Sequence, residues 1–506
     1  MFRTFVAALA MILLPGLAAA QTRCNQVLAQ LGGLLVDATC FESTDLTTTN
    51  PATTPANNSI PTLPAFAFTP QTDRTTIAPS AAKRPPITKV VPGLQIQARF
   101  ANDATNQGRF LLRLPDDWNG KLVVAGASGT RSEFNGDFAW SDFVVQKGYA
   151  YASQNKGVLN LQFSVQTDPL ACRLNPASTL WVRFYDNEAN QPFTRWQEFM
   201  VRAAKVARVG VKARYGNWPR HTYAVGTSNG GYQVRRAVET APDLFDGGVD
   251  WEGTYVDERD PGVLNELPSA VLNWPDYVAT GFSATSTAAR NIQANGYPPD
   301  IVIPSATPTA PTASFWLNHW NSFWEVTQCQ WQKRLDPTYD TYGGNPVPPV
   351  PGTATYNYYA RLSQSDVGAN MAAFATTGRI QRPLITVAGT MDALLPINHH
   401  ARAYARRVEA QQDDHPGKGK GHAWGRWNKE PAYRLYEVQN GNHLETYQDT
   451  FPQLELIMPH AQRAFDLLVR HVEQRTPLPP DQCIGRSGVI LDAPAATGPC
   501  AQLFVP

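Results

Sequence analysis

The chain carries no excess of either charge. Its 43 Lys and Arg residues nearly balance 42 Asp and Glu residues, so the formal net charge is +1 at pH 7, and charged residues make up only 17% of the sequence. A protein that binds nucleic acid or an anionic membrane surface normally carries a basic patch or run. The composition therefore argues against nucleic acid as the partner and indicates a small or neutral molecule.

Long hydrophobic runs are lacking after the N-terminus. Residues 1–20 contain one early positive charge, Arg3, then an apolar stretch from Phe5 to Leu14, and they end in Ala18-Ala19-Ala20. This order is typical of a cleaved secretory signal peptide, and the apolar part is shorter than the roughly 20 residues that a bilayer requires. We therefore expect residues 1–20 to be a signal peptide and the mature protein to be secreted or periplasmic, without a membrane span.

The cysteines lack the C-x-x-C spacing of zinc or redox sites. All six lie beyond residue 20, and an even number of cysteines in an oxidising compartment favours disulfides. Proximity in the sequence predicts two pairs, and the two cysteines that remain would form a third. This set of three pairs is one of many possible connectivities. The predicted pairs are Cys24 with Cys40, Cys483 with Cys500, and Cys172 with Cys329.

Buried-strand patterns alternate with helical patterns over most of the chain. This alternation predicts an α/β fold with a mostly parallel sheet flanked by helices. Strands are expected at 94–100, 109–114, 121–125, 149–153, 223–225, 245–250, 383–388 and 433–438, the first two antiparallel, and helices at 196–209 and 232–240. The expected organisation is a signal peptide (1–20), an N-terminal extension with a Thr/Pro-rich linker (21–92), a core in two parts (93–253 and 378–506, the latter with a C-terminal tail), and between them a cap or lid (254–377).

The pentapeptide Gly226-Thr227-Ser228-Asn229-Gly230 lies between the expected strand at 223–225 and the expected helix at 232–240. A nucleophilic serine on a tight strand-to-helix turn needs small residues two positions before and after it, so that the backbone can bend. This G-x-S-x-G pattern in this context is the nucleophile elbow of an α/β-hydrolase. Ser228 is therefore the candidate nucleophile.

A serine hydroxyl needs a general base and an acid that orients the base, and in this fold they follow the serine in the order acid, then histidine. Asp392 follows the expected strand 383–388, and His443 follows the strand 433–438, so both fall at the carboxyl ends of strands. Asp392 is the candidate acid, with Asp250 in reserve, and His443 is the candidate base.

The other histidines near these positions have simpler interpretations. His399 and His400 follow Asp392 too closely to come from the next strand, which favours surface or packing roles. His415 and His422 flank a Gly/Lys-rich stretch that is typical of a solvated loop rather than a metal site.

An oxyanion intermediate needs two N–H donors. The Asn229 backbone N–H is the expected first donor, and the turn after the strand 121–125 supplies the second, from Ala127 or from Gly126. A glycine turn with a purely structural role remains the alternative.

The expected cap is rich in tryptophan. Such residues usually build a small core of their own, because large aromatic side chains dominate burial energetics. Alternatively, some form a wall against an aromatic or extended substrate. The candidates for substrate contact are Trp251, which lies just before the expected cap, and Trp316 and Trp320 within it. The cap also contains Trp274, Trp324 and Trp331.

These motifs resemble the secreted esterases that include tannases, feruloyl esterases and 3-hydroxybutyrate oligomer hydrolases. The resemblance covers roughly residues 109–158, 223–253 and 383–484. Its specific parts are Asp117-Trp118-Asn119-Gly120-Lys121, Ser228-Asn229-Gly230-Gly231, and the run from Gly441-Asn442-His443 to Leu478-Pro479-Pro480. The last two are closer to the hydroxybutyrate oligomer group.

One departure bears on the substrate. Tannases and feruloyl esterases of this group have a disulfide between cysteines directly before the serine and directly after the histidine, and this chain has Thr227 and Leu444 there. A tannase-type substrate is therefore less favoured. The cap also lacks the acidic calcium-binding loop of tannase relatives, so we expect no metal and no cofactor.

The sequence predicts a secreted serine carboxylic-ester hydrolase whose substrate is a small or oligomeric ester: a hydroxyacid oligomer, a polyester fragment or an aromatic ester. Two alternatives remain open: an amidase or peptidase with the same triad, and a non-catalytic extracellular binding protein on a hydrolase scaffold. The sequence gives no indication of the oligomeric state.

Overall fold

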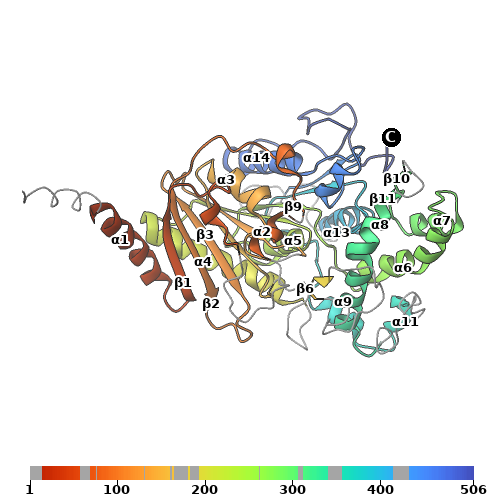
Figure 1. The fold of residues 1–506 in the computed structure, drawn as a ribbon, viewed down its shortest axis with the longest axis horizontal. Coiled ribbons are helices and arrows are strands. Elements are labelled where there is room, and N and C mark those ends of the chain that lie inside the picture. The colour runs from red at the N-terminus through yellow and green to blue at the C-terminus, as the bar shows by residue number, and fades with distance from the viewer. Residues whose placement is uncertain are drawn as a thin grey trace, which may run out of the picture.

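The computed structural model describes residues 14–56, 69–75, 77–129, 132–159, 162–163, 181–182, 193–260, 262–305, 312–339, 356–413 and 432–506, with backbone alone at 14–21, 162–163 and 181–182. These residues form an α/β-hydrolase core with a mostly helical segment beside it (Figure 1). The α/β-hydrolase fold predicted from the sequence is therefore confirmed.

A sheet of ten strands runs through the described residues in the order β1-β2-β3-β5-β4-β8-β9-β12-β13-β14. The strands β1, β2, β3 and β5 pair antiparallel, and the pairs from β5 through β4 to β14 are parallel. Their bounds are β1 Leu35–Ser43, β2 Gly93–Phe100, β3 Arg109–Pro115, β4 Lys121–Gly126, β5 Ala150–Gln154, β8 His221–Thr227, β9 Gly247–Trp251, β12 Leu384–Gly389, β13 Tyr433–Val438 and β14 Gln482–Ile484.

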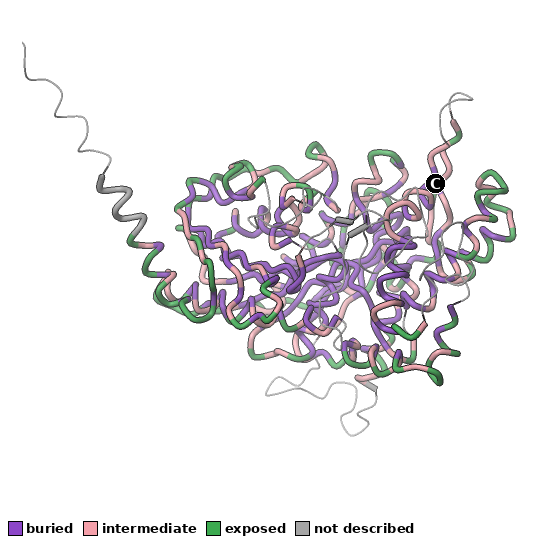
Figure 2. Tube along the Cα trace, turned by 60° about the horizontal axis from the view of Figure 1, so that its bottom comes forward, coloured by how far each residue is buried: buried purple, intermediate pink, exposed green. Residues whose placement is uncertain are grey.

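Helices cover both faces of this sheet, which explains why its central strands are continuous apolar runs. Successive residues of β8 show this: Ala224 belongs to the hydrophobic cluster on one face, and Tyr223 and Val225 to the cluster on the other. Figure 2 shows the result as buried strands at the centre and exposed turns around them. One face is covered by α1 Leu14–Leu31, α4 Arg195–Tyr215, α5 Asn229–Thr240 and α13 Ala401–Asp413, and the other by α3 Asp142–Val145 and α14 Met458–Gln474.

Residues 254–377, the expected cap, are mostly helical where they are described, and they share a third hydrophobic cluster. That cluster is rich in aromatic side chains; for example, Trp274 stacks on Trp320 with ring centroids 5.4 Å apart. The helices are α6 Val263–Ala279, α7 Thr287–Ala294, α8 Phe315–His319, α9 Glu325–Leu335, α11 Tyr358–Arg361 and α12 Val367–Ala372, with the π-helical turn η4 Trp320–Trp324 and the strands β10 Val302–Ile303 and β11 Ala313–Ser314.

The remaining elements are short. They are the helix α2 Pro70–Thr75, the 3-10 turns η1 Pro51–Thr53, η2 Ala81–Lys83 and η5 Glu445–Asp449, the π-helical turn η3 Asp137–Ser141, and the strands β6 Gln162–Phe163 and β7 Trp181–Val182. No helix of the described part of the chain is long and apolar enough to cross a membrane.

Two of the predicted disulfides are present. Cys24 is bonded to Cys40, and Cys483 to Cys500, with Cα–Cα distances of 5.6 and 4.7 Å. The first ties α1 to β1, and the second ties β14 to the C-terminal tail. The third predicted pair includes Cys172, which lies outside the described residues.

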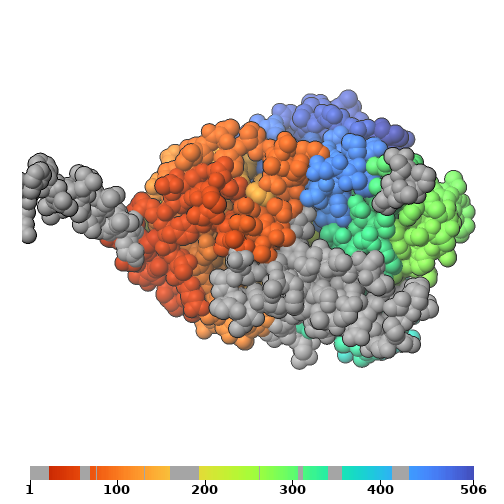
Figure 3. All heavy atoms as spheres, viewed as in Figure 1, coloured from red at the N-terminus to blue at the C-terminus, as the bar shows by residue number. Residues whose placement is uncertain are grey.

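The N-terminal extension is part of the folded body. Strand β1 forms the edge of the sheet beside β2, and the segment after α2 contacts the C-terminal part, where the Glu445 N–H donates to the Ile77 carbonyl at 3.1 Å and Lys83 pairs with Asp449 at 2.7 Å. Figure 3 shows orange residues bordering the blue C-terminal residues on one face of the molecule, with the red N-terminal residues beyond them.

Asp250, the reserve candidate for the catalytic acid, holds the core together instead. It is fully buried on β9 and accepts hydrogen bonds from Arg235 Nε at 2.6 Å, from the Gly253 N–H at 2.6 Å and from the Thr386 hydroxyl at 2.9 Å. The Arg235 guanidinium lies 4.3 Å from the centre of the Tyr404 ring. Asp250 therefore compensates a buried cation.

We expect Asp250→Ala to lower the free energy of unfolding by about 3–5 kcal/mol, because the substitution leaves the Arg235 charge buried without its partner. Denaturant unfolding measures this difference. Asp117→Ala is the matched control: Asp117 pairs with Lys89 at 3.2 Å, but its side chain is 91% exposed, so the cost should stay below about 1 kcal/mol. Equal losses in the two variants would contradict the assignment.

Candidate active site

Ser228 lies on the turn between β8 and α5 with φ 61° and ψ −124°, a backbone conformation that non-glycine residues rarely adopt. The turn is held by the Ser228 N–H, which donates to the Trp251 carbonyl at 2.9 Å, and by the Ser228 carbonyl, which accepts from the Tyr232 N–H at 3.1 Å. The strained serine between a strand and a helix has the geometry of a nucleophile elbow.

Glycines make this turn possible through close backbone contact. A Cβ at Gly230 would lie 2.6 Å from the Gly126 carbonyl oxygen, and a Cβ at Gly126 would lie 2.6 Å from the Gly230 oxygen. A Cβ at Gly226 would also collide with the Gly230 carbonyl. The end of β4 and the first turn of α5 therefore meet backbone to backbone.

The other two predicted triad residues are hydrogen-bonded to each other. His443 Nδ1 lies 2.8 Å from Asp392 Oδ2, and both side chains are 1% exposed. The second oxygen of Asp392 accepts from the N–H groups of Leu394 and Leu395 at 2.8 and 2.7 Å. Three donors thus fix the Asp392 carboxylate in place, and the Nδ1 contact orients the imidazole.

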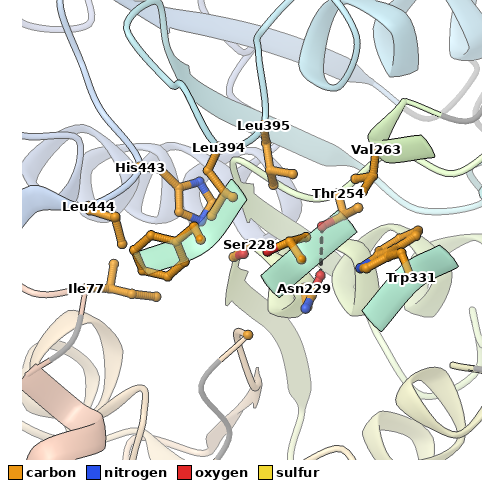
Figure 4. Close-up of a pocket in the computed structure, with 13 residues that line it drawn as sticks. Ile77, Ser228, Asn229, Thr254, Val263, Trp331, Leu394, Leu395, His443 and Leu444 are labelled. Atoms are coloured by element: carbon orange, nitrogen blue, oxygen red, sulfur yellow. Dashed lines mark hydrogen bonds between the residues drawn. The ribbon is translucent and has the colours of Figure 1, made fainter. Parts of the chain in front are cut away.

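Ser228 and His443 line one cavity, into which the loops after β8, β9, β12 and β13 project (Figure 4). Its walls are mainly apolar, with Trp331 and Val263 on one side of Ser228 and Ile77 and Leu444 on the side of His443. The complete lining is Ile77, Gly129, Ser228, Asn229, Thr254, Val263, Phe323, Thr327, Trp331, Leu394, Leu395, His443 and Leu444.

Of the three residues expected to supply oxyanion donors, Asn229 lines this cavity, and Ala127 and Gly126 do not. Asn229 lines it as the first residue of α5, where its backbone N–H has no intrahelical acceptor, and its side-chain Oδ1 accepts from the Thr254 hydroxyl at 2.8 Å. The Ala127 N–H, in contrast, donates to Gln233 Oε1 at 2.8 Å, and Gly126 packs against α5. In the turn after β4, Gly129 lines the cavity instead.

The tryptophans chosen for substrate contact do not line the cavity; Trp331 of α9 does. Trp251 is buried against Trp140, with ring centroids 6.4 Å apart. Trp316 is buried in the cap and donates from Nε1 to the Pro298 carbonyl at 3.1 Å, and Trp320 stacks on Trp274. The core-building interpretation therefore fits all three.

Sequence reasoning missed Glu252, which follows β9 directly. Glu252 Oε2 lies 3.5 Å from His443 Nδ1, on the buried side of the histidine. Glu252, Asp392 and His443 are the one group of at least three His, Cys, Asp or Glu side chains in the described residues that could hold a metal ion. His443 Nδ1 is the atom that pairs with Asp392, so a metal ion bound by these three groups would displace that hydrogen bond.

The four histidines that the sequence analysis set aside have structural contacts or lie outside the described residues. His400 Nε2 lies 2.8 Å from Glu266 Oε1, its Nδ1 accepts from the Tyr255 N–H at 2.9 Å, and burial lowers its pKa to about 3. His399 Nε2 lies 2.8 Å from the Asn295 carbonyl. His415 and His422 lie outside the described residues.

Comparison with known proteins finds a family model that matches the part of the chain containing Asp392 and His443. Residues 356–499 match the family model 3HB-oligomer hydrolase (3HBOH). This match confirms, for the C-terminal part of the chain, the resemblance inferred from sequence motifs. The matched segment contains Asp392 and His443 and does not reach Ser228.

Curated relatives match a similar length of sequence. The D-(-)-3-hydroxybutyrate oligomer hydrolase of Burkholderia thailandensis is 32% identical over 140 residues, which is 26% of this chain and 18% of that protein. The enzyme of the same name from Burkholderia mallei is 31% identical over 140 residues, with the same coverage of both chains. The alignments thus span under a fifth of the length of these relatives.

Solved structures are similar over more of the chain but at low identity. Feruloyl esterase B from Aspergillus oryzae covers 90% of this chain and 91% of its own, with a TM-score of 0.48 and 14% identity. Tannin acyl hydrolase from Aspergillus niger covers 84% and 89%, with a TM-score of 0.42 and 12% identity. At sequence identities and TM-scores this low, the substrates of those enzymes cannot be assigned to this chain.

Proposed function

We propose that the protein is an exported serine carboxylic-ester hydrolase that cleaves esters of short hydroxyacids. The observation that carries the proposal is the joint placement of three groups: the strained elbow of Ser228, His443 on the same cavity, and Asp392 hydrogen-bonded to His443 Nδ1 at 2.8 Å. The disulfides of the two ends of the chain support an oxidising compartment.

In the proposed reaction, His443 Nε2 removes the proton from the Ser228 hydroxyl while Ser228 Oγ attacks the ester carbonyl carbon. The resulting oxyanion intermediate collapses to an acyl-enzyme, and His443 returns its proton to the leaving alcohol. A water molecule, deprotonated by His443, then attacks the acyl carbon. The acid leaves, and Ser228 recovers its proton. Throughout, Asp392 keeps the Nδ1–H tautomer and stabilises the charged imidazolium.

The oxyanion donors we propose are the backbone N–H groups of Asn229 and Gly129. Buried Lys156 supports the second choice, because its Nζ donates to the Ser128 carbonyl at 2.5 Å. That carbonyl and the Gly129 N–H belong to one trans peptide unit, in which they point in opposite directions. Lys156 thus fixes the direction of the Gly129 N–H, at a residue that lines the cavity.

The cavity favours a small acyl group with a polar atom. Most of its wall is apolar, but the Thr327 hydroxyl on α9 is buried, with the residue 7% exposed, and has no hydrogen-bond partner among the described residues. An unsatisfied buried hydroxyl costs about 1–3 kcal/mol. A hydroxyl or ester oxygen of a bound hydroxyacid would satisfy it, in agreement with the relatives named 3-hydroxybutyrate oligomer hydrolases.

The first prediction compares the wild type with Ser228→Ala on 3-hydroxybutyrate dimer, methyl gallate, methyl ferulate, p-nitrophenyl butyrate and a matched p-nitroanilide. We expect acid release from the dimer by the wild type, at least about a thousandfold less by the variant because the nucleophile is lost, and fluorophosphonate labelling of the wild type alone. Labelling with cleavage of only the anilide would indicate an amidase. No labelling and no hydrolysis would indicate a binding protein.

The second prediction concerns Thr327→Val, which removes the hydroxyl and keeps the shape of the side chain. We expect kcat/KM for p-nitrophenyl 3-hydroxybutyrate to fall about tenfold, the value of one hydrogen bond, and kcat/KM for p-nitrophenyl butyrate to change less than about twofold. Steady-state kinetics on the two esters test this. Equal losses on both esters would contradict a contact between Thr327 and the hydroxyacid.

The third prediction concerns Lys156→Met. We expect kcat for p-nitrophenyl butyrate to fall about 10- to 100-fold with little change in KM, because a misoriented donor weakens binding of the oxyanion more than binding of the ester. The control is Lys147→Met, which removes the pair of Lys147 with Asp466 at 2.5 Å on the surface and should leave kcat unchanged. A change in KM alone would place Lys156 in substrate binding.

A further inference from the structure

Glu252 is held rigidly beside the triad. Its backbone has φ 50°, and its N–H donates to the Val387 carbonyl of β12 at 2.9 Å. Its side-chain Oε1 accepts from the Gly389 N–H at 2.8 Å, and the residue is 2% exposed. Backbone and side chain are therefore both tied to the strand that precedes Asp392.

The second oxygen of Glu252 is directed at the catalytic pair. Oε2 lies 3.5 Å from His443 Nδ1, and one ligand atom each of Glu252, Asp392 and His443 lie within 4.8 Å of one another. Oε2 has no hydrogen-bond partner among the described residues. A buried, unpartnered carboxyl oxygen beside the Asp392–His443 contact needs a proton or a partner.

Two buried carboxyl groups this close cannot both be ionised. Asp392 receives three donors, from Leu394, Leu395 and His443, whereas Glu252 receives one within hydrogen-bond geometry, from Gly389, with the Trp251 indole as a weaker neighbouring donor. The ionised form is therefore better stabilised on Asp392. In agreement, burial raises the pKa of Glu252 well above its usual range, and the neighbouring Asp392 charge raises it further.

We propose that Glu252 is a positioning residue for His443: it carries a proton beside ionised Asp392, and it becomes the ionised partner of His443 Nδ1 when Asp392 is neutralised. The two carboxyl groups thus share one negative charge beneath the imidazole. This inference deepens the proposed function and, for its kinetic part, rests on it.

Other ionisable groups face this cluster, and their states bear on the test. Burial lowers the pKa of His319 to about 4 and that of His400 to about 3, so both are neutral at pH 7. Burial raises the pKa of Glu445 and of Glu266 to about 8, and that of Tyr297 well above its usual range. Glu445 and Glu266 therefore titrate in the assay range, so all variants are compared at the same pH, and the contribution of Glu445 is measured with a variant of its own.

The first experiment needs no catalytic activity. The infrared difference spectrum at pH 7 between the wild type and Glu252→Gln shows whether the lost group was a carboxylic acid or a carboxylate, because protonated and ionised carboxyl groups have separate bands. We expect a carboxylic-acid band. The difference between Asp392→Asn and Asp392→Asn/Glu252→Gln should instead show a carboxylate band. A carboxylate band in the first spectrum overturns the proposal, even if the protein hydrolyses no ester.

The second experiment measures p-nitrophenyl ester hydrolysis by the same variants. We expect Glu252→Gln to lower kcat/KM at pH 7 by about threefold, far less than Asp392→Asn does, because the amide N–H₂ replaces the acid O–H as a donor but cannot take up the charge. Asp392→Asn should retain activity that rises with pH, and adding Glu252→Gln should lower it at least about tenfold and remove that rise.

Glu445→Gln is the matched control. Glu445 is another buried carboxyl near the cluster, but it accepts from the Met458 N–H at 2.6 Å and from the Ile457 N–H. Adding Glu445→Gln to Asp392→Asn should leave activity unchanged, and thermal unfolding checks that every variant is folded. Equal activity of Asp392→Asn with and without Glu252→Gln would overturn the reserve role, whereas an inactive wild type would overturn the proposed function instead.

Discussion

The site depends on one steric constraint, the backbone contact between the end of β4 and the first turn of α5. Gly126 and Gly230 meet so closely that a Cβ on either would lie 2.6 Å from the carbonyl oxygen of the other. This contact places the elbow of Ser228 beside the turn that contains Gly129, so that both line one cavity. The strain at Ser228 persists because packing on both sides of it leaves no alternative backbone path.

The strand order of the sheet then determines which acids meet the histidine. β9, β12 and β13 are adjacent, so residues in the loops that follow them, Glu252, Asp392 and His443, converge at one edge. Asp250 lies two residues before Glu252, but it is within β9 and faces α5, where it pairs with Arg235. The same strand thus supplies one carboxylate to stabilise a buried cation and one carboxyl to the site.

Local signals explain what could be predicted from the sequence. The glycine pattern around Ser228 and the strand ends before Asp392 and His443 are short motifs in a fixed chain order, which confines the candidates to a few positions. The short loops closed by Cys24–Cys40 and Cys483–Cys500 made those disulfides predictable in the same way. Each of these inferences needs only a few neighbouring residues.

Non-local contacts explain what could not be predicted. The Ala127 N–H donates to Gln233, which lies more than a hundred residues later in the sequence. A single glutamate after a strand, such as Glu252, belongs to no sequence pattern that indicates which residue it contacts. The aromatic composition of the cap predicted a core, but helix orientation decided that Trp331, rather than Trp316 or Trp320, faces the cavity. Strand β1 was missed because its burial is irregular, with most of its residues half-buried or exposed.

The cavity wall is built by residues from three parts of the chain. Ile77 comes from the N-terminal extension, Trp331 and Thr327 from the helical cap segment, and Leu394, Leu395 and Leu444 from the loops that carry the acid and the base. The core thus supplies Ser228 and His443, the reacting groups that we propose, whereas the N-terminal extension and the cap segment supply apolar surface and the Thr327 hydroxyl. Because an apolar wall discriminates weakly between acyl groups of similar size and a hydroxyl that binds the substrate discriminates more strongly, the hydroxyacid preference that we propose rests on Thr327 more than on the aromatic residues around it.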